Sequence, residues 1–189
     1  MKTQNQTMLS ENTLTSRPTD IIAGFPVRPG FFELNGATPL SNGVNFTAHT
    51  RHGTSCELLL FHSGEEEPFA VLPFPNACRI GDVYSMIVMG LDIEDLEYGY
   101  RIDGPYEPEK GHIFDKTKVL LDPYAKAVAG QREWGQQKIG SYHARVVRDS
   151  FDWEDMPQST RKISDLIIYE LHVRGFTQDS SSGVMHPGT

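Results

Sequence analysis

The 189-residue sequence predicts a mainly β protein: an immunoglobulin-like antiparallel β-sandwich, then an irregular connector, then the first strand of a parallel barrel. Three observations indicate this order. Short segments with alternating apolar residues, separated by turn signals, fill the first half of the chain. A stretch dominated by turn residues and scattered charges follows. A nearly continuous apolar run at 166–173 then stands close to the end, which is typical of strands buried on both faces.

We expect four parts along the chain. Residues 1–18 are polar and aperiodic, which favours a disordered tail. Residues 19–106 form the sandwich, residues 107–163 a connector that packs between domains, and residues 164–189 the start of a barrel. A complete (β/α)8 barrel takes about 250 residues, so the barrel is expected to be incomplete and truncated here.

The first clear sandwich strand lies at 44–48, after the turn signal at 41–43. Its alternation places Val44, Phe46 and Ala48 on one face, which predicts a core-facing stripe. Further strands are expected at Cys56–Phe61, Phe69–Leu72, Val83–Met89 and Tyr98–Ile102. An exposed hairpin loop at 63–68 is expected between the first two of them. In the third, the side chains at 84, 86 and 88 are expected to share a face.

Composition makes several classes of protein unfavourable. The net charge is −8 and the basic residues are scattered, which argues against nucleic acid or an anionic membrane as a partner. No apolar run approaches the roughly 20 residues that span a bilayer. The N-terminus lacks the apolar core of a secretory signal. With only Cys56 and Cys78 available, we expect free, reduced thiols and a cytoplasmic protein.

Several segments, in unbroken order over about residues 22–189, resemble the N-terminal part of glycogen-debranching enzymes and isoamylases of the α-amylase superfamily. One departure is Asp115, where the family usually has Asn after the Gly-His-x-Phe element. The segments that carry the resemblance are Gly36–Ala48, Cys56–Phe61, Tyr98–Tyr106, Gly111–Phe114, Leu120–Lys126, Phe151–Trp153 and Ile168–Thr177.

The resemblance implies a carbohydrate-binding module of family 48 followed by the first strand of the catalytic barrel. It implies that the whole enzyme hydrolyses α-1,6 branch linkages of glycogen-like α-glucans. Such enzymes are retaining hydrolases, with an Asp nucleophile and a Glu acid/base about 5 Å apart and a second, stabilising Asp. Those residues lie on later barrel strands, so the resemblance assigns no catalytic residue here, and we expect this fragment to be inactive alone.

The implied partners are an α-glucan, such as glycogen or branched maltodextrin, and the missing catalytic domain. No cofactor is implied. Two alternatives stay open at this point: a stand-alone glucan-binding module, and a non-catalytic scaffolding β-sandwich. The apolar run at 166–173 argues against the first alternative, because a self-contained module has no use for an unpaired strand with two apolar sides.

Glu170 and His172 suggest an acid/base pair, since residues two apart on a strand share a face. We favour a structural role instead: a buried carboxylate tied to His172 or Arg174. A place in the active-site lining of the whole enzyme is the lesser alternative.

The acidic segments 92–97 and 65–67 are interpreted as solvated turns, because they lack the loop pattern of a calcium site. The histidines, His112 and His143 among them, show no paired metal-ligand spacing, so we expect no metal site. His112 is interpreted as a hydrogen-bonded residue at the domain junction.

Five aromatic residues could stack on glucose rings, because aromatic faces suit the apolar faces of sugars. Packing in the core or at an interface is the favoured interpretation for all of them, so the substrate-binding residues stay unassigned. They are Tyr98, Tyr100, Tyr106, Trp134 and Trp153.

Overall fold

The computed structural model describes residues 17–130, 142–148, 152 and 161–188. The chain divides into two compact units, residues 1–149 and residues 150–189. Each unit is described by itself below. The predicted tail at 1–18 falls almost entirely outside the described residues, as do both tryptophans.

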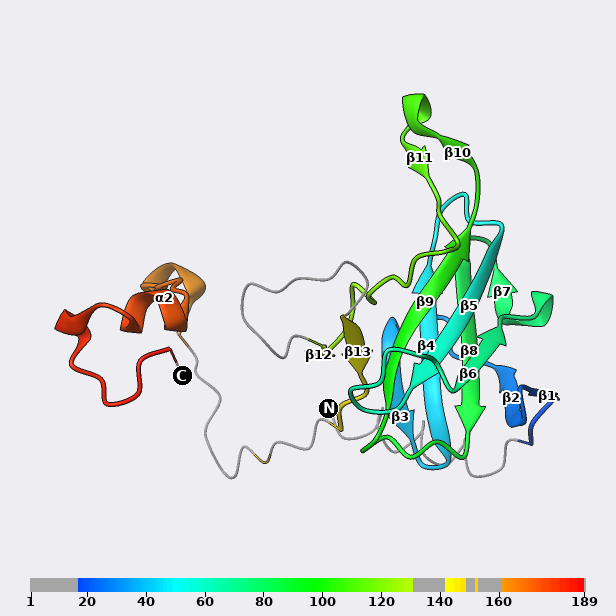
Figure 1. Ribbon diagram of the computed structural model, residues 1–189, viewed down its shortest axis with the longest axis horizontal. Coiled ribbons are helices and arrows are strands. Elements are labelled where there is room, and N and C mark those ends of the chain that lie inside the picture. Colours follow the sequence, from blue (N-terminus) through cyan, green and yellow to red (C-terminus); the bar gives the residue numbers. More distant parts are fainter. Residues whose placement is uncertain (1–16, 131–141, 149–151, 153–160, 189) are drawn as a thin grey trace. The chain divides into compact units, whose positions relative to one another are not determined.

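The first unit contains a sheet in which every pair of neighbouring strands is antiparallel (Figure 1). The strand order is β1-β2-β8-β4-β3, and β7 also pairs with β8. Its strands are β1 (Asp20–Ile22), β2 (Phe25–Pro29), β3 (Gly36–Leu40), β4 (Gly43–His49), β7 (Arg79–Ile80) and β8 (Val83–Met89).

The second sheet of this unit has the order β12-β13-β9-β5-β6 and is also antiparallel. A separate hairpin, β10 (Tyr106–Glu107) and β11 (His112–Ile113), projects beyond the sandwich (Figure 1). The strands of the second sheet are β5 (Ser55–Phe61), β6 (Ala70–Pro73), β9 (Glu97–Asp103), β12 (Ala127–Ala129) and β13 (His143–Arg145).

The core lies between the two sheets and follows the alternation of their strands. Phe46 of β4 and Tyr98 of β9 are fully buried, and their ring centroids are 5.1 Å apart in an edge-on contact. The predicted stripes on β4 and β8 are confirmed, because all six of their side chains are buried in this core: Val44, Phe46, Ala48, Tyr84, Met86 and Val88. Two facing apolar stripes therefore specify the sandwich.

The sequence predicted β4, β5, β6, β8 and β9 to within a residue or two at each end. It did not predict the short strands β1 to β3. Strands β12 and β13, which extend the second sheet, lie in the segment expected to be a connector. These strands have three to five residues, too few for a periodic pattern to emerge from the sequence.

Two glycines of the β9 region let the following chain pack on the second sheet. A Cβ atom at Gly99 would lie 2.5 Å from Cγ1 of Val119, and one at Gly104 would lie 2.6 Å from the ring of Phe114. Real Cβ atoms do not come this close, so only glycine permits the contact. Val119 therefore packs against β9, and Phe114 packs against the residue that follows it.

The second unit has no β-strand among its described residues, 152 and 161–188. It contains η3 (Ile163–Asp165), α2 (Val173–Thr177) and η4 (Ser180–Ser182). No strand forms at 166–173 in this structure. The assignment of this segment to a catalytic barrel stays a prediction. Leu166 and His172 have extended backbone angles, but no neighbouring strand supplies the hydrogen bonds that define a sheet. Within the parts of the chain that the structure describes, no helix is both long and apolar enough to cross a bilayer.

Candidate functional site

A polar groove of about 560 Å³ lies on the outer face of the second sheet. Side chains alternate along β5 and β9, so the residues that line the groove face away from the core residues beside them in the sequence. Ser55 lies opposite Asp103, and Glu57 lies opposite Arg101. The groove is lined by Ser55, Glu57, Arg101, Asp103, Lys116 and Thr117.

The charges of the groove balance within it. Nε of Arg101 is 3.1 Å from Oε2 of Glu57, and Nζ of Lys116 is 3.8 Å from Oδ2 of Asp103. Two acids and two bases give no formal net charge, and two hydroxyl groups add further donors and acceptors. Such a surface suits a neutral, polyhydroxylated ligand better than an anion.

A second feature lies at the edge of the sandwich, where β2 and β6 begin. We call Phe25, His62 and Phe69 the aromatic edge. The ring of Phe69 is stacked on the imidazole of His62, with centroids 4.4 Å apart and planes inclined by 28°. The ring of Phe25 lies 6.2 Å from that of Phe69, centroid to centroid, and Phe69 remains 41% exposed. An exposed, braced aromatic ring of this kind can stack on a sugar.

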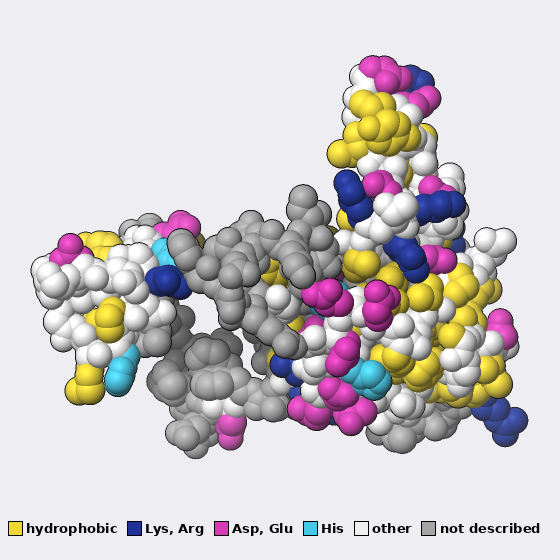
Figure 2. All heavy atoms as spheres, in the orientation of Figure 1, with side chains coloured by type: hydrophobic (Ala, Val, Ile, Leu, Met, Phe, Trp, Pro, Cys, Tyr) yellow, Lys and Arg dark blue, Asp and Glu magenta, His cyan; other side chains and the backbone are white. Residues whose placement is uncertain are grey.

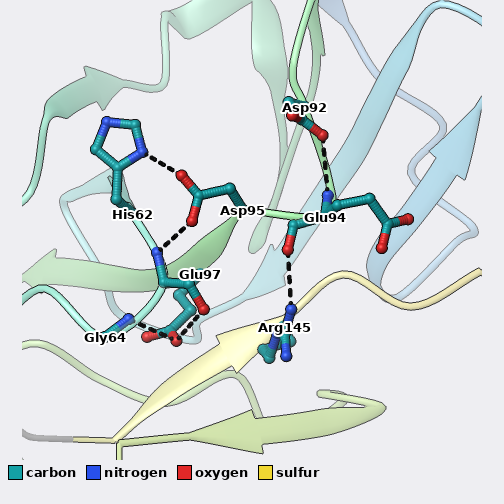
Figure 3. Close-up of polar contacts among 8 residues, drawn as sticks. His62, Gly64, Asp92, Glu94, Asp95, Glu97 and Arg145 are labelled. Atoms are coloured by element: carbon teal, nitrogen blue, oxygen red, sulfur yellow. Dashed lines mark hydrogen bonds and ion pairs between the residues drawn. The ribbon is translucent and has the colours of Figure 1, made fainter.

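The turn that carries His62 is held by Asp95 (Figure 3). Nδ1 of His62 is 2.8 Å from Oδ2 of Asp95, and the backbone N–H of Ser63 donates to Oδ1 of the same carboxylate at 3.0 Å. The hydrogen bond from Ser63, followed by that from His62, holds the pKa of Asp95 below its usual value. Asp95 therefore anchors the turn as an ionised group.

Glu97 also binds the turn that carries His62. Its Oε1 accepts hydrogen bonds from the backbone N–H of Gly64 at 3.0 Å and from the hydroxyl of Ser63 at 3.3 Å. Its Oε2 lies 3.1 Å from Nδ1 of His143 on β13. Both members of this pair are buried, with side chains only 3% and 5% exposed. The imidazole of His143 also stacks on Phe61, with centroids 3.8 Å apart.

Asp122, from the predicted junction motif, closes one end of the sandwich. It is buried, and Oδ2 accepts a hydrogen bond from the hydroxyl of Tyr98 at 2.8 Å. Oδ1 accepts from the backbone N–H of Tyr124, also at 2.8 Å. Burial raises the pKa of this carboxyl group, although its hydrogen bonds oppose the shift. The carboxylate thereby ties residues 120–124 to β9.

Residues 106–128 expose six large apolar side chains. Figure 2 shows hydrophobic side chains gathered on the projecting hairpin, where Tyr106 is 72% and Ile113 69% exposed. A small cavity of about 200 Å³ lies farther along, between β4, β9 and residues 120–124. We call the exposed apolar side chains of this segment the connector surface: Tyr106, Ile113, Leu120, Leu121, Tyr124 and Val128.

The aromatic candidates from the sequence divide clearly. Tyr98 and Tyr100 are buried in the core, which confirms packing as their role. Tyr106 is exposed, so core packing is excluded for it. Trp134 and Trp153 lie outside the described residues. No sequence pattern marked Phe69 as a candidate, because its exposure depends on the position of β6 at the edge of its sheet.

The acidic segments also divide. Glu65–Glu67 is exposed, as predicted. In the 92–97 segment Asp92, Glu94 and Asp95 are exposed, but Glu97 is buried, so a solvated turn is the wrong interpretation for that residue. Glu97 is the first residue of β9, and a charge at a strand end gives no sequence signal that a histidine 46 residues later will pair with it.

The remaining polar candidates do not form a site. Glu170 and His172 are exposed, so the predicted buried carboxylate is wrong; Nδ1 of His172 instead accepts from the backbone N–H of Gly175 at 3.2 Å, at the start of α2. The ring of His112 lies 4.6 Å from that of His52. Asp115 accepts two hydrogen bonds from Thr117. Among the described residues no group of three or more His, Cys, Asp or Glu could hold a metal ion.

The two antiparallel sheets and the core between them define the first unit as a β-sandwich domain, with a polar groove on its outer face. Residues 35–125 match the family model of carbohydrate-binding module 48, the isoamylase N-terminal domain. This segment therefore belongs to that family. The match spans β3 to the Asp122 motif and ends before β12.

Curated relatives are isoamylases and glycogen-debranching enzymes. The chloroplastic isoamylase SU1 of Zea mays is 36% identical over 181 residues, which cover 89% of this chain and 22% of that protein. The glycogen debranching enzyme of Salmonella typhi is 35% identical over 156 residues, covering 76% of this chain and 23% of that protein. The chain thus spans about a fifth of the length of these relatives.

Solved structures confirm the fold. A pullulanase from Paenibacillus barengoltzii, in complex with maltohexaose and alpha-cyclodextrin, superposes with a TM-score of 0.58 at 20% sequence identity. The alignment covers 82% of this chain and 22% of that one. The pullulanase from Bacillus acidopullulyticus gives a TM-score of 0.57, also at 20% identity, over 82% of this chain and 17% of its own.

Proposed function

We propose that this chain is the glucan-binding N-terminal part of a hydrolase of the isoamylase and glycogen-debranching type, acting on α-1,6 branch linkages of glycogen-like α-glucans. The observation that carries the proposal is the match of residues 35–125 to the isoamylase N-terminal module. Relatives with these activities in their names align over most of the chain, which supports the same assignment.

The polar groove and the aromatic edge are the glucan-binding surface in this proposal. The groove offers charged and hydroxyl groups that can hydrogen-bond to sugar hydroxyls, and its charges are already balanced. Phe69 offers a partly exposed aromatic ring for contact with a sugar. Together they supply the apolar platform and the directed polar groups that a sugar site needs.

Isothermal titration with maltoheptaose, supported by retardation in a glycogen-containing gel, tests the binding. Phe69→Ala and Arg101→Ala are each expected to weaken binding about tenfold, or about 1.4 kcal/mol. Ile80→Ala and Arg51→Ala are matched controls, because both residues are exposed outside the proposed surface. Absence of heat and of retardation for the unmodified chain would refute glucan binding.

In this proposal the hydrolytic step belongs to residues outside this sequence. We therefore expect no reducing sugar to appear when the chain is incubated with branched maltodextrin. If linear chains were released, and release persisted after further purification of the protein, the 189 residues would hold a catalytic group of their own.

A second function, bracing of a catalytic domain, is favoured by the connector surface. Exposed apolar side chains concentrated on one segment typically mark a protein contact. The expected occupant is the catalytic domain of the whole enzyme. A relative's hydrolase domain, prepared without its own N-terminal module, is expected to bind this chain and to lose affinity for the Leu121→Ser variant. Equal affinity for both forms would exclude this contact.

A further inference from the structure

The turn at residues 62–64 connects the aromatic edge to the interior of the sandwich. On the exposed side of the turn, His62 stacks on Phe69 and is paired with Asp95. On the buried side of the turn, the backbone N–H of Gly64 and the hydroxyl of Ser63 donate hydrogen bonds to Glu97. The orientation of the His62 ring therefore depends on two carboxylates that lie only two positions apart in the chain (Figure 3).

Glu97, the carboxylate nearer the interior, is held by contacts on both sides. Both oxygens of Glu97 are engaged, one by the turn and the other by His143. A buried carboxylate without a partner is costly, so the pair is strongly coupled. His143 is itself fixed by stacking on Phe61 and by the pairing of its strand with β9.

Arg145 strengthens this attachment of β13. It lies opposite Glu97 in the strand pairing, and its guanidinium donates to the backbone oxygen of Glu94 at 3.0 Å. The short strand β13 thus contacts the 92–97 segment at two points. The two β13 residues in these contacts, His143 and Arg145, lie beyond residue 125, where the family match ends.

We infer that Glu97 and His143 are positioning residues of the glucan-binding surface, and that the functional module extends through β13 rather than ending at residue 125. The inference rests on the proposed function. His143 acts through Glu97 and the 62–64 turn on the stack of His62 and Phe69, without touching the sugar. Loss of the imidazole leaves Oε2 of Glu97 buried without its partner, which releases the turn and tilts His62 away from Phe69.

Nuclear magnetic resonance of the His62 imidazole provides a direct readout, because the neighbouring Phe69 ring shifts its proton signals. Glu97→Gln and His143→Gln are expected to move these signals and to weaken maltoheptaose binding on the order of tenfold. Asp95→Asn, at an exposed position that cannot disrupt the core, is expected to act in the same direction. Glu94→Gln, also exposed, is the matched control and should change neither quantity.

The outcomes separate the two levels of the argument. If the unmodified chain does not bind maltoheptaose, or Phe69→Ala binds as well as it does, the proposed glucan surface is wrong. If Phe69→Ala loses binding while Glu97→Gln, His143→Gln and Asp95→Asn keep both the affinity and the His62 signals, the positioning role is overturned. A loss of affinity with unchanged His62 signals also overturns it, because the effect would then not pass through the turn.

Discussion

Asp122 shows how one buried carboxyl group makes stability depend on pH. Burial raises its pKa above the usual value of 3.8 in the folded chain. Below pH 3.8 the group is protonated in both states, and its contribution to stability is complete. As the pH rises, the unfolded chain loses the proton first, so the contribution is lost progressively until the pH passes the raised pKa of the folded state.

Asp122→Asn replaces the titrating carboxyl group with an amide that does not ionise. The substitution should therefore remove the loss of stability that accompanies ionisation of Asp122. We expect the free energy of unfolding of the unmodified chain, relative to that of Asp122→Asn, to fall as the pH rises above 3.8. Urea denaturation at several pH values measures this difference. The lowered pKa of Asp95 acts in the opposite sense, but it is common to both proteins and cancels. A difference that is constant or rises with pH would contradict the assignment.

Phe46 tests the core at the same scale. Its side chain is fully buried and meets the ring of Tyr98 from the opposite sheet. Phe46→Ala is expected to lower the free energy of unfolding by about 3–5 kcal/mol, because it leaves a cavity between the sheets. Chemical denaturation monitored by circular dichroism gives the value. An unchanged midpoint would mean that Phe46 does not face the core.

Single residues were predictable where the alternation of a strand set their side. Phe46, Tyr84 and Tyr98 are examples, since their burial follows from a pattern within a few neighbouring residues. The pair of Glu97 and His143 was not predictable, because it depends on a contact between distant strands. The groove also required the register of β5 against β9, which one sequence does not supply.

At the scale of elements, the strands with the longest alternating patterns were predicted best. β4, β5, β8 and β9 each have seven residues and form the centre of the two sheets. The apolar run at 166–173 has an equally strong pattern but forms no strand. A strand exists only with a neighbour, so the apolar pattern alone was insufficient there.

Hydrogen exchange distinguishes these two cases. We expect the backbone amides of residues 166–171 to exchange quickly, since Ile167, Ile168 and Tyr169 are 75–88% exposed and no sheet protects them. The amides of β4 and β8 should exchange orders of magnitude more slowly. Mass spectrometry after short labelling times resolves the two groups. Equal protection of the two would show that residues 166–171 are paired with another strand in solution.

At the scale of the whole molecule, the two compact units differ in how much they bury. Both sheets and the core belong to residues 1–149. In the second unit, none of the residues whose burial the structure describes, 152, 161–172 and 174–188, is buried. The first unit therefore contains the cooperative folding unit that denaturation detects.

A chain shortened to residues 1–149 tests this division. We expect its free energy of unfolding to agree with that of the full chain within about 0.5 kcal/mol, because no buried side chain has been identified in the part removed. Urea denaturation followed by circular dichroism compares the two forms. A larger loss would show that residues 150–189 stabilise the sandwich.

The two free cysteines, Cys56 and Cys78, are both buried in the core between the sheets. Burial, with a smaller contribution from Glu57, raises the pKa of Cys56 to about 12; burial and then Asp20 raise that of Cys78 to about 11. Neither thiol ionises appreciably at neutral pH. Alkylating reagents and oxidants, which react with the thiolate, should therefore react slowly with the folded chain. Reaction with a maleimide should follow the opening of the sandwich, which makes the pair an intrinsic kinetic probe of unfolding.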